Sequence, residues 1–147
     1  MNKEPFGLER TYHAPIEKVW DALTDADRMR KWYFDLPDFK AEKGFAFEFG
    51  GEGKDGQKFN HKCIVTEADA PRLLAHSWTY EGLPGYSEVR FELFNEGDHT
   101  RIRLTHTGLE SFVDNGTSFQ QENFAEGWSM IIGENLKNFV EHTQSNG

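Results

Sequence analysis

Three histidines and the single cysteine of this sequence lie on expected strands and could act as metal ligands, acids or bases. His61 and Cys63 stand two residues apart, so their side chains would share one face of a strand, as half of a zinc site would require. The two remaining ligands would have to be His76 and His106, because the chain has no second cysteine. A thiol and an imidazole packed in or near the core explain the pair more simply, and we expect no metal site.

His106 alternates with the apolar residues Ile102 and Leu104, so it should point inward from its strand. An inward histidine could act as a general acid or base, anchor a ligand inside a cavity, or be a core residue bonded to neighbouring groups. The same alternatives apply to His76, which also alternates with large apolar residues. We favour the core role over catalysis for both and predict no catalytic residue, while ligand contact and a core role stay equally open.

Aromatic side chains are the strongest functional signal, because the chain contains thirteen Phe, four Trp and four Tyr spread over many segments. If these segments converge, the rings either form a pocket for a flat or greasy small molecule or simply fill the core. Gly127 and Gly133 favour a pocket, since they would remove volume beside Trp128 on the last helix. The residues predicted to line a ligand site are Trp32, Trp78, Phe91, His106, Phe124 and Trp128.

One glycine-rich stretch matches a nucleotide-binding pattern by its letters alone. Residues 51–56 read Gly-Glu-Gly-Lys-Asp-Gly and fit G-x-G-x-x-G, a loop that must open a helix to receive a phosphate. Here a strand is expected to follow and the loop is acidic, so a hairpin turn explains the glycines better. The carboxylates mostly alternate out of phase with apolar residues, which is typical of a solvated face rather than of paired-carboxylate catalysis. No cofactor is predicted.

Charge and composition restrict the possible partners. The formal net charge of −9 repels phosphate backbones and anionic lipid, so we expect neither nucleic acid nor a membrane as partner. Cys63 alone cannot form a disulfide within the chain, and the first residues lack the apolar run of a signal peptide. We therefore expect a cytoplasmic protein, monomer or homodimer, in which residues 1–147 form one domain.

The apolar periodicity predicts three helices. Pro15 suits the first turn of a helix whose apolar stripe runs to Leu23. A second short helix should begin after Asp25 and end near Trp32. A helix over about residues 123–142 closes the chain and carries its own apolar stripe.

Strands fill the rest of the chain, and they are expected at residues 6–12, 45–49, 59–67, 73–80, 87–94 and 100–107. Matching the apolar faces of the last two places Glu92 opposite Arg103. Short turns between sequential strands give an antiparallel arrangement. The predicted fold is therefore α+β, a helix-grip fold: a curved antiparallel sheet of about six strands wraps around the long C-terminal helix, with two short helices after the first strand.

Five short segments stand in the order and spacing of a known family. They are residues 14–20 (Ala-Pro-Ile-Glu-Lys-Val-Trp), 30–33 (Arg-Lys-Trp-Tyr), 73–78 (Leu-Leu-Ala-His-Ser-Trp), 100–109 (Thr-Arg-Ile-Arg-Leu-Thr-His-Thr-Gly-Leu) and Gly127-Trp128. With them the chain resembles the activator of heat-shock-protein ATPase homologue-like family. That family lies within the START-like superfamily (SRPBCC) of polyketide cyclase-like proteins and the birch-pollen allergen. The resemblance implies the helix-grip fold, and its members include hydrophobic-ligand binders, cyclases or dehydratases of polyketides, and a co-chaperone domain.

Because a fold does not assign a function, three hypotheses remain. The first is a carrier, sensor or stress-related protein that binds a small hydrophobic ligand, aromatic or lipid-like, in a cavity between the sheet and the C-terminal helix. The second is a cyclase, dehydratase or hydrolase using the same cavity, with His106 or His76 as acid or base; the chain has no convincing dyad, so we lean against an enzyme. The third is a co-chaperone-like interaction module, with a chaperone partner implied by the family analogy only.

Overall fold

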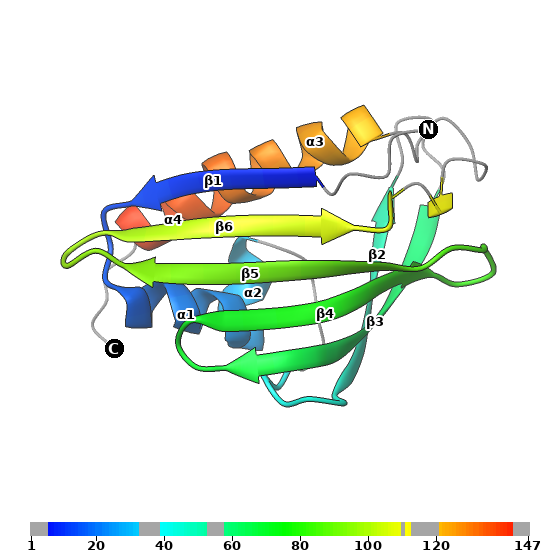
Figure 1. Cartoon of the computed structure of the whole chain (residues 1–147), viewed down its shortest axis with the longest axis horizontal. Helices are drawn as coiled ribbons and strands as arrows, with labels where there is room; N and C mark the ends of the chain where they lie inside the picture. Colours follow the sequence, from blue (N-terminus) through cyan, green and yellow to red (C-terminus); the bar gives the residue numbers. More distant parts are fainter. Residues whose placement is uncertain (1–5, 33–38, 53–57, 110, 113–120, 143–147) are drawn as a thin grey trace.

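The computed structural model describes residues 6–32, 39–52, 58–109, 111–112 and 121–142 (Figure 1). The strands are β1 (Phe6–Tyr12), β2 (Ala46–Glu52), β3 (Lys58–Asp69), β4 (Leu73–Tyr80), β5 (Ser87–Asn95) and β6 (Thr100–Thr107). The short helices are α1 (Ile16–Thr24) and α2 (Ala26–Trp32). The C-terminal helix consists of α3 (Gln121–Met130), the π-helical segment η3 (Ile131–Leu136) and α4 (Lys137–His142).

The strands form one antiparallel sheet in the order β1-β6-β5-β4-β3-β2. Glu92 lies opposite Arg103, which confirms the predicted register of β5 and β6. The pairing of β3 with β4 shifts between Val65 and Glu67, and a bulge of this kind bends a strand and increases its twist. In Figure 1 β2 and β3 turn away from the plane of the other strands, and the C-terminal helix runs along β1. The predicted helix-grip α+β fold is confirmed.

The core is built from alternate residues of the central strands. In β5 and β6 every second side chain is buried, and the buried sets face one another: Val89 pairs with His106, and Phe91 pairs with Leu104. A shift of one residue would turn either set to the solvent, so burial itself specifies this register. His106 is thus fully buried in a row of apolar residues, as its position in the sequence predicts.

Helices α1 and α2 are joined by a tryptophan. The apolar stripe of α1 is buried up to Leu23, and the indole N–H of Trp32, at the end of α2, donates to the Ala22 carbonyl at 2.8 Å. This bond aligns the two short helices although their own lengths are too small for independent stability. With the two helices in this position, Met29 and Trp32 are buried opposite side chains of β2, β4 and β5.

A buried tyrosine fixes the C-terminal helix to β1. The Tyr12 hydroxyl donates to the backbone carbonyl of Ile132 at 2.6 Å, within the π-helical segment. Tyr12 is fully buried, and burial raises the pKa of its phenol, so the group stays a donor. One residue further on, a Cβ on Gly133 would come within 3.2 Å of the Arg10 guanidinium, so glycine lets β1 approach the helix closely.

The Tyr12→Phe variant should therefore lose stability. Removing the hydroxyl takes the donor from the buried Ile132 carbonyl, which costs about 1–3 kcal/mol of unfolding free energy. The measurement is urea unfolding followed by far-ultraviolet circular dichroism. Tyr86→Phe is the matched control, because Tyr86 is 58 % exposed and its change should stay within about 0.5 kcal/mol. Equal stability of the two variants would contradict the role given to Tyr12.

Candidate functional site

Rings from five strands, from the short segment at residues 111–112 and from the C-terminal helix meet inside the curved sheet in what we call the aromatic cluster. Its members are Phe47, Phe49, His61, His76, Trp78, Tyr80, Phe91, His106, Phe112, Phe124 and Trp128. Trp78 lies at the centre, with ring centroids 5.5 Å from Phe49, 5.5 Å from His106 and 5.4 Å from Trp128. Most of these contacts are tilted or edge-to-face, the geometry that the ring quadrupoles favour.

A chain of hydrogen bonds with one possible direction crosses this cluster. The Trp128 indole can only donate, and it donates to Nδ1 of His106 at 3.0 Å. Nδ1 must therefore be the acceptor, and the proton sits on Nε2, which lies 2.8 Å from the Ser87 hydroxyl oxygen. Ser87 in turn donates to the Trp78 carbonyl at 2.8 Å.

His106 is consequently a neutral residue with both ring nitrogens bonded to the protein. Burial lowers its pKa to about 3, and the neighbouring His76 adds to the effect. Neither nitrogen is available to take a proton from a substrate. Both hydrogen bonds favour a core role over catalysis for this residue.

His61 and Cys63 are also buried, on the same face of β3. The His61 ring stacks on Phe49 with centroids 4.5 Å apart, and its Nδ1 lies 3.2 Å from the Phe49 carbonyl. Burial lowers the pKa of His61 to about 4 and raises that of the Cys63 thiol well above its usual value. In the part of the chain that the structure describes, no three His, Cys, Asp or Glu side chains are placed to hold a metal ion.

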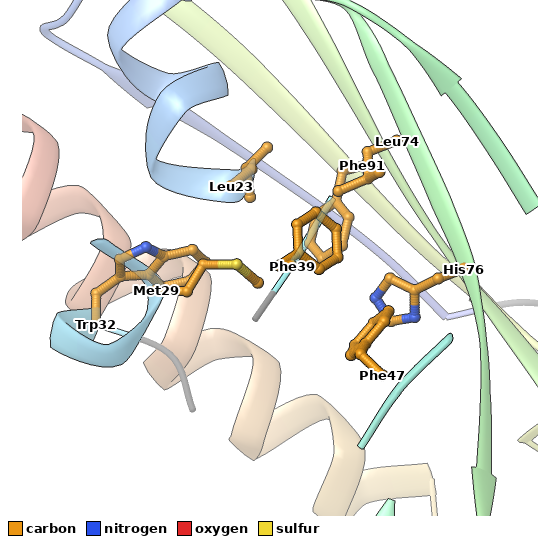
Figure 2. Close-up of a pocket in the computed structure, with 8 residues that line it drawn as sticks. All are labelled: Leu23, Met29, Trp32, Phe39, Phe47, Leu74, His76 and Phe91. Atoms are coloured by element: carbon orange, nitrogen blue, oxygen red, sulfur yellow. The ribbon is translucent and has the colours of Figure 1, made fainter. Parts of the chain in front are cut away.

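A cavity lies beside the aromatic cluster, between the two short helices and the sheet. Its lining residues are Leu23, Met29, Trp32, Phe39, Phe47, Leu74, His76 and Phe91 (Figure 2). All the space between atoms in the cavity and at its solvent side amounts to about 230 Å³, whereas the space open to the centre of a water molecule is about 10 Å³. The smaller volume decides what fits when the cavity is closed, and it corresponds to about one water molecule.

His76 is the polar group that faces this apolar space. Figure 2 shows its ring projecting from β4 toward Phe39 and Phe47. Its Nδ1 lies 2.8 Å from the carbonyl of Ser77, and since a carbonyl only accepts, Nδ1 carries the proton. Burial lowers the pKa of His76 to about 4, so the ring is neutral near pH 7.

Trp32 separates the cavity from an open groove on the outside of the protein. That groove lies between α2 and the C-terminal helix, and its lining residues are Lys31, Trp32, Asn135, Asn138 and Phe139. Trp32 lines both spaces.

The six predicted lining residues fall into two groups. Trp32 and Phe91 line the cavity, as does His76, the second candidate for an acid or base. The other four, Trp78, His106, Phe124 and Trp128, lie in the adjacent aromatic cluster, which reaches the cavity through His76 and Phe91. None of the lining residues comes from the C-terminal helix, so the described cavity lies under α1 and α2 instead of under that helix.

The interpretation of the two helix glycines is wrong. A Cβ on Gly127 would meet open space, and Gly133 faces Arg10 on β1, so neither removes volume beside Trp128. The cavity is also lined by five residues that were not predicted as site residues: Leu23, Met29, Phe39, Phe47 and Leu74. The apolar stripe of the first helix marks Leu23 as buried, but a stripe does not distinguish a cavity wall from a packed core.

The three buried histidines should make the protein sensitive to mild acid. Their folded-state pKa values of about 4, 4 and 3 lie below the usual 6.5, so below about pH 6.5 the unfolded chain binds more protons than the folded one. The stability contributed by the three neutral histidines is fully present above about pH 6.5. As the pH falls below this value, the free energy of unfolding decreases by up to about 1.4 kcal/mol per pH unit for each histidine. Carboxylates with lowered pKa, such as Glu9 and Glu141, contribute only in a more acidic range.

Urea unfolding between pH 7.5 and 5 measures this slope. Replacing His61 with Phe removes one of the three groups and should reduce the slope by about a third. The Tyr86→Phe protein serves as the control with all three histidines intact. The prediction is contradicted if stability stays constant over this range, or if His61→Phe leaves the slope unchanged.

Comparisons with known proteins agree with this architecture. The chain is similar to the crystal structure of CalU16 from Micromonospora echinospora, at 29 % identity over 97 % of this chain and 77 % of that one, with a TM-score of 0.69. It is similar to the solution structure of BH1534 from Bacillus halodurans, at 27 % identity over 93 % and 96 % of the two chains, with a TM-score of 0.72. DynU16, a protein of the dynemicin biosynthetic locus, shares the fold at 17 % identity over 97 % of this chain and 49 % of its own, with a TM-score of 0.77.

The sequence comparisons identify the family. A search of curated proteins finds no match. Among the residues described, no helix has both the length and the apolar character needed to cross a membrane. The sequence model of the family described as activator of Hsp90 ATPase homolog 1-like protein matches residues 13–141. That match spans nearly the whole helix-grip fold, so the chain belongs to the activator of Hsp90 ATPase homolog 1-like family.

Proposed function

We propose that the protein binds a small hydrophobic molecule in the cavity between the sheet and the helices, as a carrier or sensor. The observation that supports this most directly is an apolar cavity that carries one inward-facing polar group, His76. Binding sites for small molecules combine these two features, since the apolar wall supplies affinity and the polar group supplies orientation. The helix-grip fold of the family is a ligand-binding fold in general.

Binding requires the cavity to open, because the closed space admits about one water molecule. The wall formed by α2 is the part suited to move. Met29 is unbranched and adapts its shape easily, and Trp32 stands between the cavity and the outer groove. A ligand would therefore come in from the groove between α2 and the C-terminal helix, past Trp32.

The expected affinity is moderate. Burying apolar surface contributes about 25 cal/mol per Å², so a ligand that buries about 300 Å² gains about 7.5 kcal/mol. Part of this gain offsets the lost freedom of the ligand and the rearrangement of the wall. Dissociation constants from about micromolar upward follow from these magnitudes.

A role in binding fits the titratable groups better than a role in catalysis. His106 is neutral and bonded at both nitrogens, and the neutral His76 is the one titratable side chain among the described lining residues of the cavity. A general acid–base mechanism commonly needs a partner group near the substrate. This supports the carrier or sensor hypothesis over the cyclase, dehydratase or hydrolase alternative.

Filling the cavity should abolish binding. Met29→Trp places a larger side chain into the space, and we expect the dissociation constant of any ligand bound there to rise at least about tenfold. Met29→Leu conserves volume and should change it by no more than about threefold. The measurement is a titration of the ¹⁵N-labelled protein followed by nuclear magnetic resonance, with aromatic polyketide-like compounds, flavonoid-like polyphenols and fatty acids.

Circular dichroism would verify that both variants are folded. Saturable binding in the wild-type protein, with shifts centred on α2, β4 and β5, supports the proposal. Binding that is unaffected by Met29→Trp would mean that the ligand lies elsewhere, and the absence of saturable binding with every compound class would contradict the proposal.

A further inference from the structure

The second ring nitrogen of His76 is a buried acceptor without a partner among the described residues. The side chain is 2 % exposed, and its Nδ1–H donates to the Ser77 carbonyl. In this tautomer Nε2 carries a lone pair and no proton. Each nitrogen of His106, in contrast, is bonded to a protein group. A buried acceptor left unpaired is costly, so Nε2 of His76 calls for a donor that the described protein does not supply.

Among the described side chains that line the cavity, none besides His76 offers a polar atom that a water molecule could share. Six of its eight lining side chains are apolar, and the indole N–H of Trp32 is already bonded to Ala22. A buried water normally makes two to four hydrogen bonds, so one at Nε2 would be held by a single strong partner. A ligand group can displace such a water with little loss, provided that it brings its own donor.

We propose that the ligand is a neutral aromatic hydroxyl compound whose O–H donates to Nε2 of His76. The proposal rests on the binding function inferred above and specifies its chemistry. The aromatic part follows from the wall, since the rings of Phe39, Phe47 and Phe91 offer faces and edges on which a flat ring can pack. A neutral donor such as a hydroxyl follows from Nε2, which can accept a hydrogen bond but cannot give one.

The same geometry excludes other head groups. A carboxylate has only acceptor oxygens, so it would need a protonated imidazole. Burial opposes that charge and holds the pKa of His76 at about 4. A methyl ether of the same ring also lacks a donor and would leave Nε2 unpaired. His76 is therefore a specificity-determining residue that separates hydroxylated aromatic compounds from fatty acids and from fully apolar rings.

The test uses three probes of one ring system and one non-aromatic probe. 2-Naphthol has the donor, 2-methylnaphthalene replaces the hydroxyl with a methyl group of similar size, and 2-naphthoate carries a negative charge. 2-Decalol keeps the hydroxyl without the aromatic ring. Dissociation constants are measured by magnetic resonance titration with the wild-type protein, His76→Phe and Leu74→Val. Leu74 lines the same cavity without a polar atom, so Leu74→Val is the matched control.

The expected result is a change in preference between variants. Relative to the wild-type protein, His76→Phe should shift the ratio of the 2-naphthol and 2-methylnaphthalene dissociation constants about tenfold toward the methyl compound. Leu74→Val should alter both constants and leave their ratio within about twofold. The naphthoate and the decalol should bind the wild-type protein more weakly than 2-naphthol.

A direct readout in the wild-type protein keeps the proposal testable if His76→Phe does not fold. The ¹⁵N resonance of His76 Nε2 should shift on titration with 2-naphthol and should stay unchanged with 2-methylnaphthalene. An unchanged ratio in His76→Phe, an unmoved ¹⁵N resonance, or tighter binding of naphthoate or decalol would overturn the assignment of the ligand class. Each of these outcomes leaves the binding function intact. The absence of saturable binding by all four probes overturns the ligand class, and if the polyketide-like compounds, polyphenols and fatty acids also fail to bind, the binding function is overturned as well.

Discussion

One hydrogen-bond chain links the last helix to the sheet, and the arrangement of the core depends on it. Trp128 donates to His106, His106 donates to Ser87, and Ser87 donates to the Trp78 carbonyl. The chain runs from the C-terminal helix through β6 and β5 to β4. It has one direction, because an indole only donates and a carbonyl only accepts. A buried histidine with one proton suits the middle of such a chain, and burial keeps it in that neutral state.

The two histidines His106 and His76 of the aromatic cluster therefore differ in how their ring nitrogens are bonded. His106 completes a network in which every ring nitrogen and hydroxyl is used, and such a network makes a core rigid. His76 has one nitrogen bonded to the backbone and the other turned to a cavity. The network includes the Trp78 carbonyl, and the Trp78 ring lies beside those of His76 and Trp128, while the opposite wall of the cavity includes the unbranched, adaptable side chain of Met29. A fixed polar group such as His76 beside an adaptable apolar wall is suited to binding a small molecule.

The family and the geometry lead to complementary conclusions. The family is named for a chaperone activator, yet a shared fold carries many functions, and the site decides among them. In this chain the cavity, its apolar wall and the exposed groove beyond Trp32 support binding of a small molecule. CalU16 and DynU16 share the helix-grip architecture at 29 % and 17 % identity, so the architecture tolerates wide changes in sequence.

The sequence by itself determined the order of the elements, the helix-grip fold, the register of β5 and β6, and the inward position of His106. These features follow from periodicity, proline and glycine positions and apolar matching, which are local or nearly local properties of the chain. Only the tertiary structure decided that the described cavity lies under α1 and α2, that Gly133 makes room for Arg10, and that His106 is bonded at both ring nitrogens while Nε2 of His76 has no partner among the described residues. Those outcomes depend on which side chains from distant segments meet, and the same inward pattern is compatible with a filled core or a hollow one.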